Sequence, residues 1–441
     1  NYVCIQVYLI RFMSKIIFTI LSLFAFMVAN AQVWDGTAKA WTKGSGTEAD
    51  PYLIETGENL AYLAETVTAG ETYEGVFFKL VNSLDMGGGL HKFSPIGFFN
   101  EYADLENPGQ MIDESKYFLG VFDGNGKTVD NVHIYFIDAQ NSVGGTGLFA
   151  CISKNAVVKN LTIGKNSVVE GTDGSGAVVG AMTGGRVENC VNKASMAITQ
   201  GLGQGGIVGT MYGGTVSGCI NDADIAGSTD LGGIAGYVDR GGVIENCYNR
   251  GNIVFTGFFA GGLVGFLVDG TLRNCYNCGE ILSDFTGNAV VGTTEDGVVI
   301  ENCYYLETEE GAADDNSAVV KKTADEMKSD DFLYALDNGQ NAWKKDANGI
   351  NNGFPLLSWQ DESTVSVGSV LQEDKIGLVV SGHNVSASVE GAYRIVVTDL
   401  SGKTIVDKII DGGSLYVPVK GLYVVTVYTK GKSESCKIII K

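Results

Sequence analysis

One apolar position recurs through the middle of the chain every 28 or 29 residues, and the same kinds of residue flank it each time. We call this position the anchor. Three residues before it the chain always has Val, Ile or Leu, and two residues before it the chain always has a polar residue. Continuing the spacing backwards places Leu161 and Val132 at the anchor, which predicts seven copies. The other five anchors are cysteines: Cys190, Cys219, Cys247, Cys275 and Cys303.

A repeat of this length predicts a solenoid, because no single copy can bury its own apolar residues without its neighbours. The copies are rich in Gly, Val, Ile and Asn and lack helical spacing of their apolar residues, so short strands and turns are expected. We therefore predict an all-β chain whose main part is a parallel β-helix. Its coils would stack at about 4.8 Å, so seven would span roughly 30 Å. Glycine clusters let adjacent backbone layers approach closely; they include residues 205–209, 232–236 and 261–265.

In-register stacking would place equivalent side chains directly above one another. The residue before the anchor is asparagine in all but one copy, so we expect a hydrogen-bonded ladder along the axis. Among its members are Asn189, Asn246, Asn274 and Asn302. The anchor cysteines would form a second ladder of buried thiols that act as small apolar side chains. Two residues before the anchor, Glu245, Arg273 and Glu301 would form a row of alternating charge on an outward face.

The segments on both sides of the repeats have the pattern of caps. Residues 44–54 predict a turn and a short strand, and residues 58–67 predict a helix with Thr56 or Gly57 at its N-cap. Residues 323–336 predict a second helix, at the far end. Such caps protect open strand edges, which otherwise promote aggregation.

The last part of the chain changes to short β-branched strands at regular spacing, which predicts a small β-sandwich after the solenoid. The expected strands are residues 377–381, 393–399, 404–410, 422–428 and 436–440.

The start of the chain has the pattern of a secretory signal peptide. From Met13 it has a basic residue, an apolar run over residues 16–28 and small residues at 29–31, and the run is short for a membrane span. We interpret residues 1–12 as a translation-start artefact. The resulting division is 1–31 upstream residues and signal peptide, 32–127 N-terminal cap and first coils, 128–306 repeats, 307–360 C-terminal cap, 361–375 linker and 376–441 C-terminal domain.

Composition narrows the function. The net charge is −21 and the 30 basic residues form no long run, so nucleic-acid binding is disfavoured. Nine cysteines in an exported chain usually indicate disulfides. Here parallel stacking holds neighbouring Cβ atoms wider apart than the roughly 3.8 Å that a disulfide prefers, so we expect free thiols in the ladder. Cys275 and Cys278 form a lone Cys-x-x-Cys with no second pair or nearby His to complete a metal site. A disulfide between them stays open.

Two family resemblances rest on particular motifs. The Gly-Gly-Leu-Val-Gly of residues 261–265 and the Asn-Cys-Tyr-Asn of residues 274–277 resemble the GLUG-motif β-solenoid repeats of Bacteroidetes surface and peptidase-associated proteins. Residues 44–54, 94–97, 122–126 and 353–359 are similar to the segments that flank those repeats. The resemblance implies attachment or display at the cell surface and implies no catalytic role.

The C-terminal domain resembles the Ig-like sorting domain of type IX secretion (Por). The matching features are residues 399–403, residues 421–425 and the closing residues 437–441. This resemblance implies a secreted or outer-membrane surface location and the type IX machinery as a partner.

Candidate catalytic groups are few. The chain has three histidines in different segments, and it has no His-Glu-x-x-His, Gly-x-Ser-x-Gly or phosphate-binding loop. Parallel β-helices host polysaccharide lyases and hydrolases that use clustered carboxylates, and Asp239, Asp269 and Glu295 are the candidates here. Their offsets from the anchor differ, so the sequence favours solvated turns. No cofactor is indicated, and the repeats lack the nonapeptide typical of calcium binding.

Binding is the favoured function. Tyr248, Tyr276 and Tyr304 each follow the anchor, and a residue after an inward cysteine points outward. We therefore expect an aromatic stripe that contacts a glycan or protein ligand, against the alternative that these rings pack beneath a loop. The sequence as a whole predicts a secreted or surface β-solenoid with a non-catalytic adhesive role, with a carbohydrate-active enzyme on the same scaffold as the alternative.

Overall fold

The structure is a computed structural model. It describes residues 33–360 apart from 108, 137–143, 199, 283–286 and 309–311, and residues 377–440 apart from 382–383, 389–391, 400–402, 412–414, 418–420 and 430–431. The predicted signal peptide and linker lie outside the described residues.

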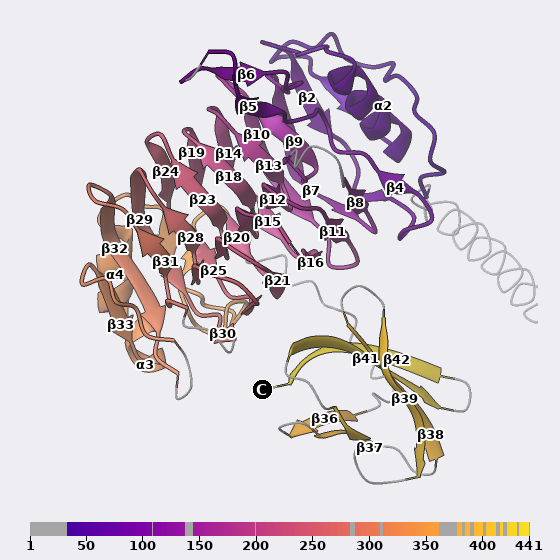
Figure 1. The fold of residues 1–441 in the computed structure, drawn as a ribbon, viewed down its shortest axis with the longest axis vertical. Coiled ribbons are helices and arrows are strands. Elements are labelled where there is room, and N and C mark those ends of the chain that lie inside the picture. The colour runs from indigo at the N-terminus through magenta and orange to yellow at the C-terminus, as the bar shows by residue number, and fades with distance from the viewer. Residues whose placement is uncertain are drawn as a thin grey trace, which may run out of the picture.

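The predicted parallel β-helix is confirmed. Each coil contributes one strand or strand pair to each face, and every pairing between successive coils of the repeat region is parallel (Figure 1). The register follows the repeat: Val158 pairs with Val187, and Val216 pairs with Ile244. The longest face contains β1(Tyr52–Ile54), β2(Phe77–Leu80), β3(Leu84–Asp85), β7(Val121–Asp130), β10(Val157–Ile163), β14(Arg186–Glu188), β15(Val191–Asn192), β19(Thr215–Ser217), β20(Ile220–Asn221), β24(Gly242–Glu245), β25(Tyr248–Asn249), β29(Gly270–Asn277), β32(Val299–Leu306) and β33(Val319–Lys322).

Three further sheets complete the coils. One consists of β4(Lys92–Phe93), β8(His133–Tyr135), β11(Val168–Glu170), β16(Ser195–Ala197), β21(Ile225–Gly227), β26(Ile253–Phe255) and β30(Ile281–Leu282). A short corner sheet consists of β12(Ser175–Gly176), β17(Gln204–Gly205), β22(Leu231–Gly232) and β27(Ala260–Gly261). The last, which we call the outer sheet, consists of β9(Phe149–Ile152), β13(Val179–Met182), β18(Val208–Tyr212), β23(Ala235–Asp239), β28(Val264–Leu267) and β31(Val291–Thr294).

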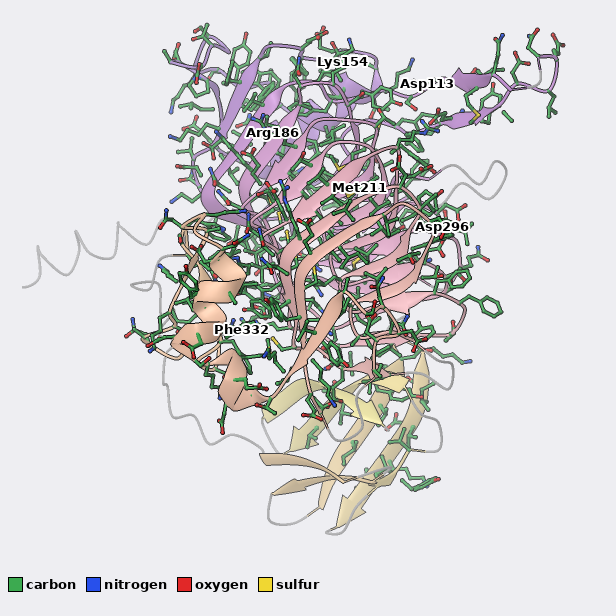
Figure 2. All side chains as sticks on the ribbon, turned by 90° about the vertical axis from the view of Figure 1, so that its left-hand side faces the viewer. Asp113, Lys154, Arg186, Met211, Asp296 and Phe332 are labelled. Atoms are coloured by element: carbon green, nitrogen blue, oxygen red, sulfur yellow. The ribbon has the colours of Figure 1, made fainter. Side chains whose placement is uncertain are left out.

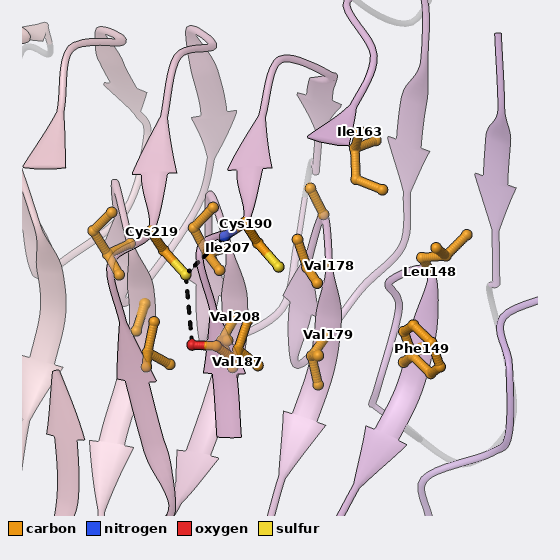
Figure 3. Close-up of a cluster of buried hydrophobic side chains, with 14 of the residues drawn as sticks. Leu148, Phe149, Ile163, Val178, Val179, Val187, Cys190, Ile207, Val208 and Cys219 are labelled. Carbon is orange, nitrogen blue, oxygen red and sulfur yellow. Dashed lines mark hydrogen bonds between the residues drawn. The ribbon is translucent and has the colours of Figure 1, made fainter. Parts of the chain in front are cut away.

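The core is a set of apolar ladders that run along the solenoid axis. Val178 and Ile207, on adjacent coils, lie in one such ladder, and all five anchor cysteines point inward and are fully buried. The backbone N–H of Cys190 donates to Sγ of Cys219 at 3.5 Å, which Figure 3 shows together with the bond from Cys219 to the carbonyl of Val187. The cysteines are free thiols, as expected from the coil spacing.

The glycine clusters mark the places where backbone layers touch. A Cβ on Gly206 would lie 2.2 Å from the carbonyl oxygen of Gly233, and one on Gly233 would lie 2.3 Å from that of Gly262. Real Cβ atoms do not approach oxygen so closely, so only glycine permits this corner of the coil.

The first coil departs from the predicted register. The structure pairs Val158 with Phe122 and Leu161 with Lys127, so Val132 is not the seventh anchor. The register shifts between Lys159 and Leu161, where β7 carries extra residues around Gly126. Extra residues in one strand shift the pairing of every residue that follows them. Val132 therefore lies at the next corner of the coil instead of at the anchor position.

The N-terminal cap agrees with the predicted helix. Helix α2(Gly57–Thr68) begins at Thr56, whose side chain accepts a hydrogen bond from the backbone N–H of Asn59. Its apolar side, which includes Leu60, Leu63 and Val67, packs on the core at the first coils. The hairpin β5(Glu101–Ala103) and β6(Met111–Asp113) projects from this region, and Figure 2 labels Asp113 where the hairpin leaves the coils.

The C-terminal cap differs from its prediction in two ways. The single helix expected over residues 323–336 is two, α3(Ala324–Met327) and α4(Asp330–Asp337), because Ser329 caps the second by accepting from the N–H of Phe332. These helices lie beside β29 and β32, along the side of the last coils, rather than over the open end alone. The end itself is closed by β33, which pairs with β32, and by Asp314, whose carboxylate accepts from the N–H groups of Val290 and Val291.

The C-terminal region has the predicted antiparallel strands and two more that the sequence did not predict, β37(Asn384–Ser388) and β40(Leu415–Tyr416). The buried side chains of Ile395, Val425 and Leu415 come from both of its sheets and form one small core. One sheet has the order β36(Gly377–Ser381), β37, β40, and the other β39(Thr404–Asp411), β38(Ala392–Asp399), β41(Gly421–Thr429), β42(Lys432–Ile440).

Candidate binding face

The predicted tyrosine stripe is not a ligand-contacting surface. Tyr248 and Tyr276 are stacked, with ring centroids 4.9 Å apart and planes 6° apart, but their exposed fractions are 1% and 0%. The C-terminal cap covers them. The ring centroid of Trp343 lies 5.3 Å from that of Tyr276, and the ring centroid of Phe332 lies 4.9 Å from that of Tyr304. The rings do point outward from the coil, as predicted. The prediction that they bind a ligand is wrong, because residues far along the chain bury them.

Polar contacts fix the cap on this stack. The hydroxyl of Tyr276 donates to the carbonyl of Pro355 at 2.6 Å and accepts from Nδ2 of Asn351 at 2.7 Å. The guanidinium of Arg250 pairs with Asp222 and also donates to the carbonyl of Ile350 at 3.1 Å. Burial raises the pKa of Tyr276 well above its usual value, so this hydroxyl stays protonated. We call the rings of Tyr248, Tyr276 and Tyr304, which lie beneath the cap, the covered stack.

The predicted asparagine ladder is present in parts. The asparagines before the anchor adopt a left-handed backbone, and Asn302 donates to Asn274 at 3.1 Å, but Gly218 interrupts the column and Asn246 donates instead to Gln340 of the cap. A more regular ladder stands two residues after the anchor, where the sequence analysis did not place one. It consists of Asn192, Asn221, Asn249 and Asn277, all buried, with side-chain bonds of 2.8, 2.7 and 2.8 Å.

The thiols have no reactive character. Burial raises the pKa of Cys190, Cys219 and Cys247 well above the usual value and that of Cys303 to about 12. The thiolate is the nucleophilic form, so these groups are inert at neutral pH. Cys278 is also a free thiol, with its pKa raised by burial to about 12. The cysteine ladder is therefore a packing feature.

A different face carries exposed aromatic residues. Along the outer sheet, Met211, Val238 and Leu267 point into the core, so the residues beside them point outward. The register aligns one outward position in each coil, and this column reads Cys151, Ala181, Thr210, Tyr237, Phe266 and Thr293. Its side chains are small in the early coils, aromatic at Tyr237 and Phe266, and small again at Thr293.

The aromatic rings on this face are in continuous contact. The ring centroid of Phe99 lies 6.3 Å from that of Tyr212, and the Tyr212 centroid lies 5.9 Å from that of Tyr237. Tyr237 stands 5.7 Å from Phe266, and that ring lies 5.5 Å from Phe259. Tyr212, Tyr237 and Phe266 are half-buried, and Tyr212 packs against Phe99 of the N-terminal region and against the Arg240 guanidinium. We call the rings of Tyr212, Tyr237, Phe266, Phe259 and Phe258 the aromatic row.

Unusual backbone supports the row at its later end. Beside the outward column runs a column of residues with positive φ, in which the early coils have Gly145, Gly174 and Gly203. The next two coils place Asp230 and Phe259 there, with φ of 52° and 58°. A bulky residue in this conformation is strained, and glycine would relieve that strain at Phe259. Phe258 and Phe259 are 65% and 43% exposed.

The change from small to large side chains leaves a hollow of about 470 Å³ over the earlier coils. Gly174 and Thr210 contribute to its floor, and Phe99, Tyr102 and Tyr212 contribute ring surfaces to its sides. A Cβ on Gly174 would lie 3.2 Å from the Thr210 hydroxyl, so a larger residue there would occupy this space. The volume falls in the range of small-molecule sites.

Three carboxylates line the hollow, and no Lys or Arg is found among its described lining residues. Glu101 lies 3.6 Å from Arg240, whose guanidinium sits 4.6 Å from the centre of the Tyr212 ring. Glu114 accepts from Nδ2 of Asn100 at 3.0 Å, and Asp173 accepts from the N–H of Leu202 at 2.6 Å. The partners of Glu114 and Asp173 are neutral, so their negative charges are not compensated by these contacts.

The neighbouring tyrosines remain neutral hydrogen-bonding groups. Burial raises the pKa of Tyr212, and burial together with the nearby Asp239 carboxylate raises that of Tyr237 to about 12. Burial also raises the pKa of Asp230 to about 6. The face therefore combines apolar ring surfaces, hydroxyl groups and carboxylates, which are the groups that stack on and hydrogen-bond to sugars.

The three predicted catalytic candidates do not come together. Asp239 ends β23 and Glu295 directly follows β31, two coils away with Val268 between them, and Asp269 lies in an exposed bend. None of them lines the hollow. Within the described part of the chain, no group of three or more His, Cys, Asp or Glu side chains is placed to hold a metal ion.

The aromatic row was missed by the sequence analysis. Tyr237 and Phe266 each come directly after the last glycine of a glycine cluster, and that glycine follows a buried apolar residue. Strict alternation counted from that residue would have placed both rings inside the coil, so the period of two gave no signal for the row.

Comparisons with known proteins reach part of the chain. No family model matches. A protein of Evansella cellulosilytica, whose name describes it as a Gly-rich membrane protein, is 29% identical over 154 residues, which are 34% of this chain and 15% of that protein. Halomucin of Haloquadratum walsbyi is 28% identical over 167 residues, 35% of this chain and 2% of its own length. No solved structure matches. In the described residues, no helix has the length and apolar character needed to cross a membrane.

Proposed function

We propose that this chain is a secreted or surface-exposed β-solenoid that binds an extended polysaccharide along the aromatic row and has no catalytic role. The observation that carries the proposal is the partly exposed, contiguous row of rings beside a hollow with hydrogen-bonding groups. Such surfaces on proteins tend to be interaction sites. The row crosses successive coils, so a polymer rather than a single small molecule fits its length.

The surface location is part of this proposal. The pattern of residues 13–31, the resemblance to GLUG repeats and to the type IX sorting domain, and the membrane protein named among the relatives all support it. Export through the type IX machinery and attachment at the outer membrane follow from the same resemblances.

A polysaccharide lyase or hydrolase is the second candidate, because Glu101, Glu114 and Asp173 line one hollow and paired carboxylates carry out glycoside cleavage. Binding is favoured because Glu101 is paired with Arg240, Asp173 accepts a backbone N–H, and Glu114 is exposed to solvent. These surroundings present the carboxylates as hydrogen-bond acceptors, and none of them supplies a sheltered proton donor.

The test measures binding of the full chain to a panel of soluble polysaccharides by affinity electrophoresis, beside an assay for new reducing or unsaturated ends. We expect binding without product release. Tyr237→Ala and Phe266→Ala should each weaken binding by about fivefold, since stacking on one aromatic ring contributes roughly 1 kcal/mol. Tyr334→Ala, which removes an exposed ring on α4, is the matched control and should leave binding unchanged. Release of products, or equal binding by all three variants, would overturn the proposal.

A further inference from the structure

We infer that the hollow binds an amino-sugar unit of the polysaccharide, with its ammonium group held by Glu114 and Asp173. This inference rests on the proposed function and names the class of sugar at the same site. It begins from the charge of the lining. Three carboxylates and no base line the space among the described residues, and the whole chain carries a net charge of −21.

Among the described residues Glu114 and Asp173 have no cationic partner, whereas the third carboxylate of the hollow and two acids of the later coils each have one. Asp222 has Arg250, Glu245 has Arg273 and Glu101 has Arg240, at 2.7, 2.6 and 3.6 Å. Glu114 and Asp173 come from separate elements, the segment after the β5–β6 hairpin and the loop before β12, and neither forms an ion pair within the described residues. Their charges are therefore available to a cation from outside the chain.

A simple inorganic cation would satisfy the carboxylates but would leave the neighbouring ring surfaces of the hollow without a partner. Phe99, Tyr102 and Tyr212 line the same space, and a pyranose ring presents C–H groups that pack on such surfaces. An amino sugar combines this ring with a positive charge. A uronic acid or a sulfated sugar would meet like charges at short range, which disfavours it.

The arrangement also gives the site a direction. The hollow is over the earlier coils, and the aromatic row continues from Tyr212 to Phe266 and Phe259 over the later ones. Next to the row, the Asp230 carboxylate is buried and has a pKa of about 6, so it adds little negative charge in mildly acidic solution. The charged unit of the polymer therefore occupies the hollow, while neighbouring units stack along the row.

The experiment compares four hexamers on the full chain by isothermal titration calorimetry: β-1,4-linked glucosamine, N-acetylglucosamine, glucose, and α-1,4-linked galacturonate. The pH is mildly acidic, so that the amine is protonated. We expect glucosamine to bind at least about tenfold more tightly than the two neutral hexamers, and galacturonate not to bind. Added salt should remove most of that preference, because it screens charges at a solvent-exposed site.

Glu114→Gln and Asp173→Asn keep the hydrogen-bond acceptors and remove the charge. Each should lower the affinity for the glucosamine hexamer by about three- to tenfold and leave the neutral hexamers unchanged. Asp296→Asn, at an exposed acid after β31, is the matched control and should change nothing.

Equal affinity for the glucosamine and neutral hexamers, or no effect of the two charge variants, would overturn the inference and leave the proposed function standing. Tighter binding of an oligolysine peptide than of the glucosamine hexamer would also overturn it, since the site would then recognise a basic protein segment. The proposed function itself fails by a different result, namely that no glycan binds or that Tyr237→Ala has no effect on any of them.

Discussion

The solenoid has two aromatic stacks, and they differ in what covers them. The covered stack of Tyr248, Tyr276 and Tyr304 lies beneath Trp343 and Phe332, whereas the aromatic row on the outer sheet faces solvent. Both arise because in-register coils align equivalent side chains along the axis. The comparison shows that a periodic aromatic position indicates a ladder, and that a ladder becomes a binding surface only where no other segment lies over it.

The largest expected effect separates the two stacks by stability. Tyr276→Ala should destabilise the chain by about 3–5 kcal/mol, because it opens a cavity beneath the cap and removes two hydrogen bonds. Tyr237→Ala should cost about 1 kcal/mol or less, because that ring is half-exposed. Chemical unfolding followed by tryptophan fluorescence measures both. Tyr276→Phe is the control and should cost about 1 kcal/mol. Similar losses for the two alanine variants would contradict the distinction between the stacks.

The next effect tests the polar support beside the covered stack. Asn249 is fully buried, bonds to Asn221 and Asn277, and both donates to and accepts from the backbone of Gly251. Asn249→Ala leaves these groups without partners and should cost about 2–4 kcal/mol. Asn189→Gly should change stability by less than about 1 kcal/mol, since its φ of 54° suits glycine. Chemical unfolding measures both variants. If Asn189→Gly loses more stability than Asn249→Ala, the ladder of Asn192, Asn221, Asn249 and Asn277 is not the stabilising one.

The smallest effect concerns Asp230, beside the aromatic row. Burial raises its pKa in the folded chain from 3.8 to about 6, so the folded state holds a proton that the unfolded state has lost. Stability therefore falls as the pH rises through this interval, and the cost is complete above about pH 6. Asp230→Asn should be more stable by about 1 kcal/mol at pH 7, with the gain disappearing near pH 4. Melting temperatures across this range measure it, and a gain that is independent of pH would contradict the assigned cause.

The sequence was informative wherever structure repeats locally. The anchor spacing predicted the parallel coils, the inward thiols and the close approach at the glycine clusters, because each coil makes the same contacts with the next. It failed at the first coil, where extra residues around Gly126 shift the register, and at Ser329, where a side-chain cap starts a second helix. Both are single local events that a period cannot reveal.

For the candidate site, the sequence predicted outward rings but selected those that the cap buries. The periodic register by itself determined that rings would stack, since equivalent positions in stacked coils must be neighbours. Only the tertiary structure decided which stack remains accessible. That decision depends on contacts such as Tyr276 with Pro355 and Trp359 with Gly218, between residues 79 and 141 positions apart. Such contacts form when distant segments find complementary apolar surfaces, and no repeat pattern specifies them.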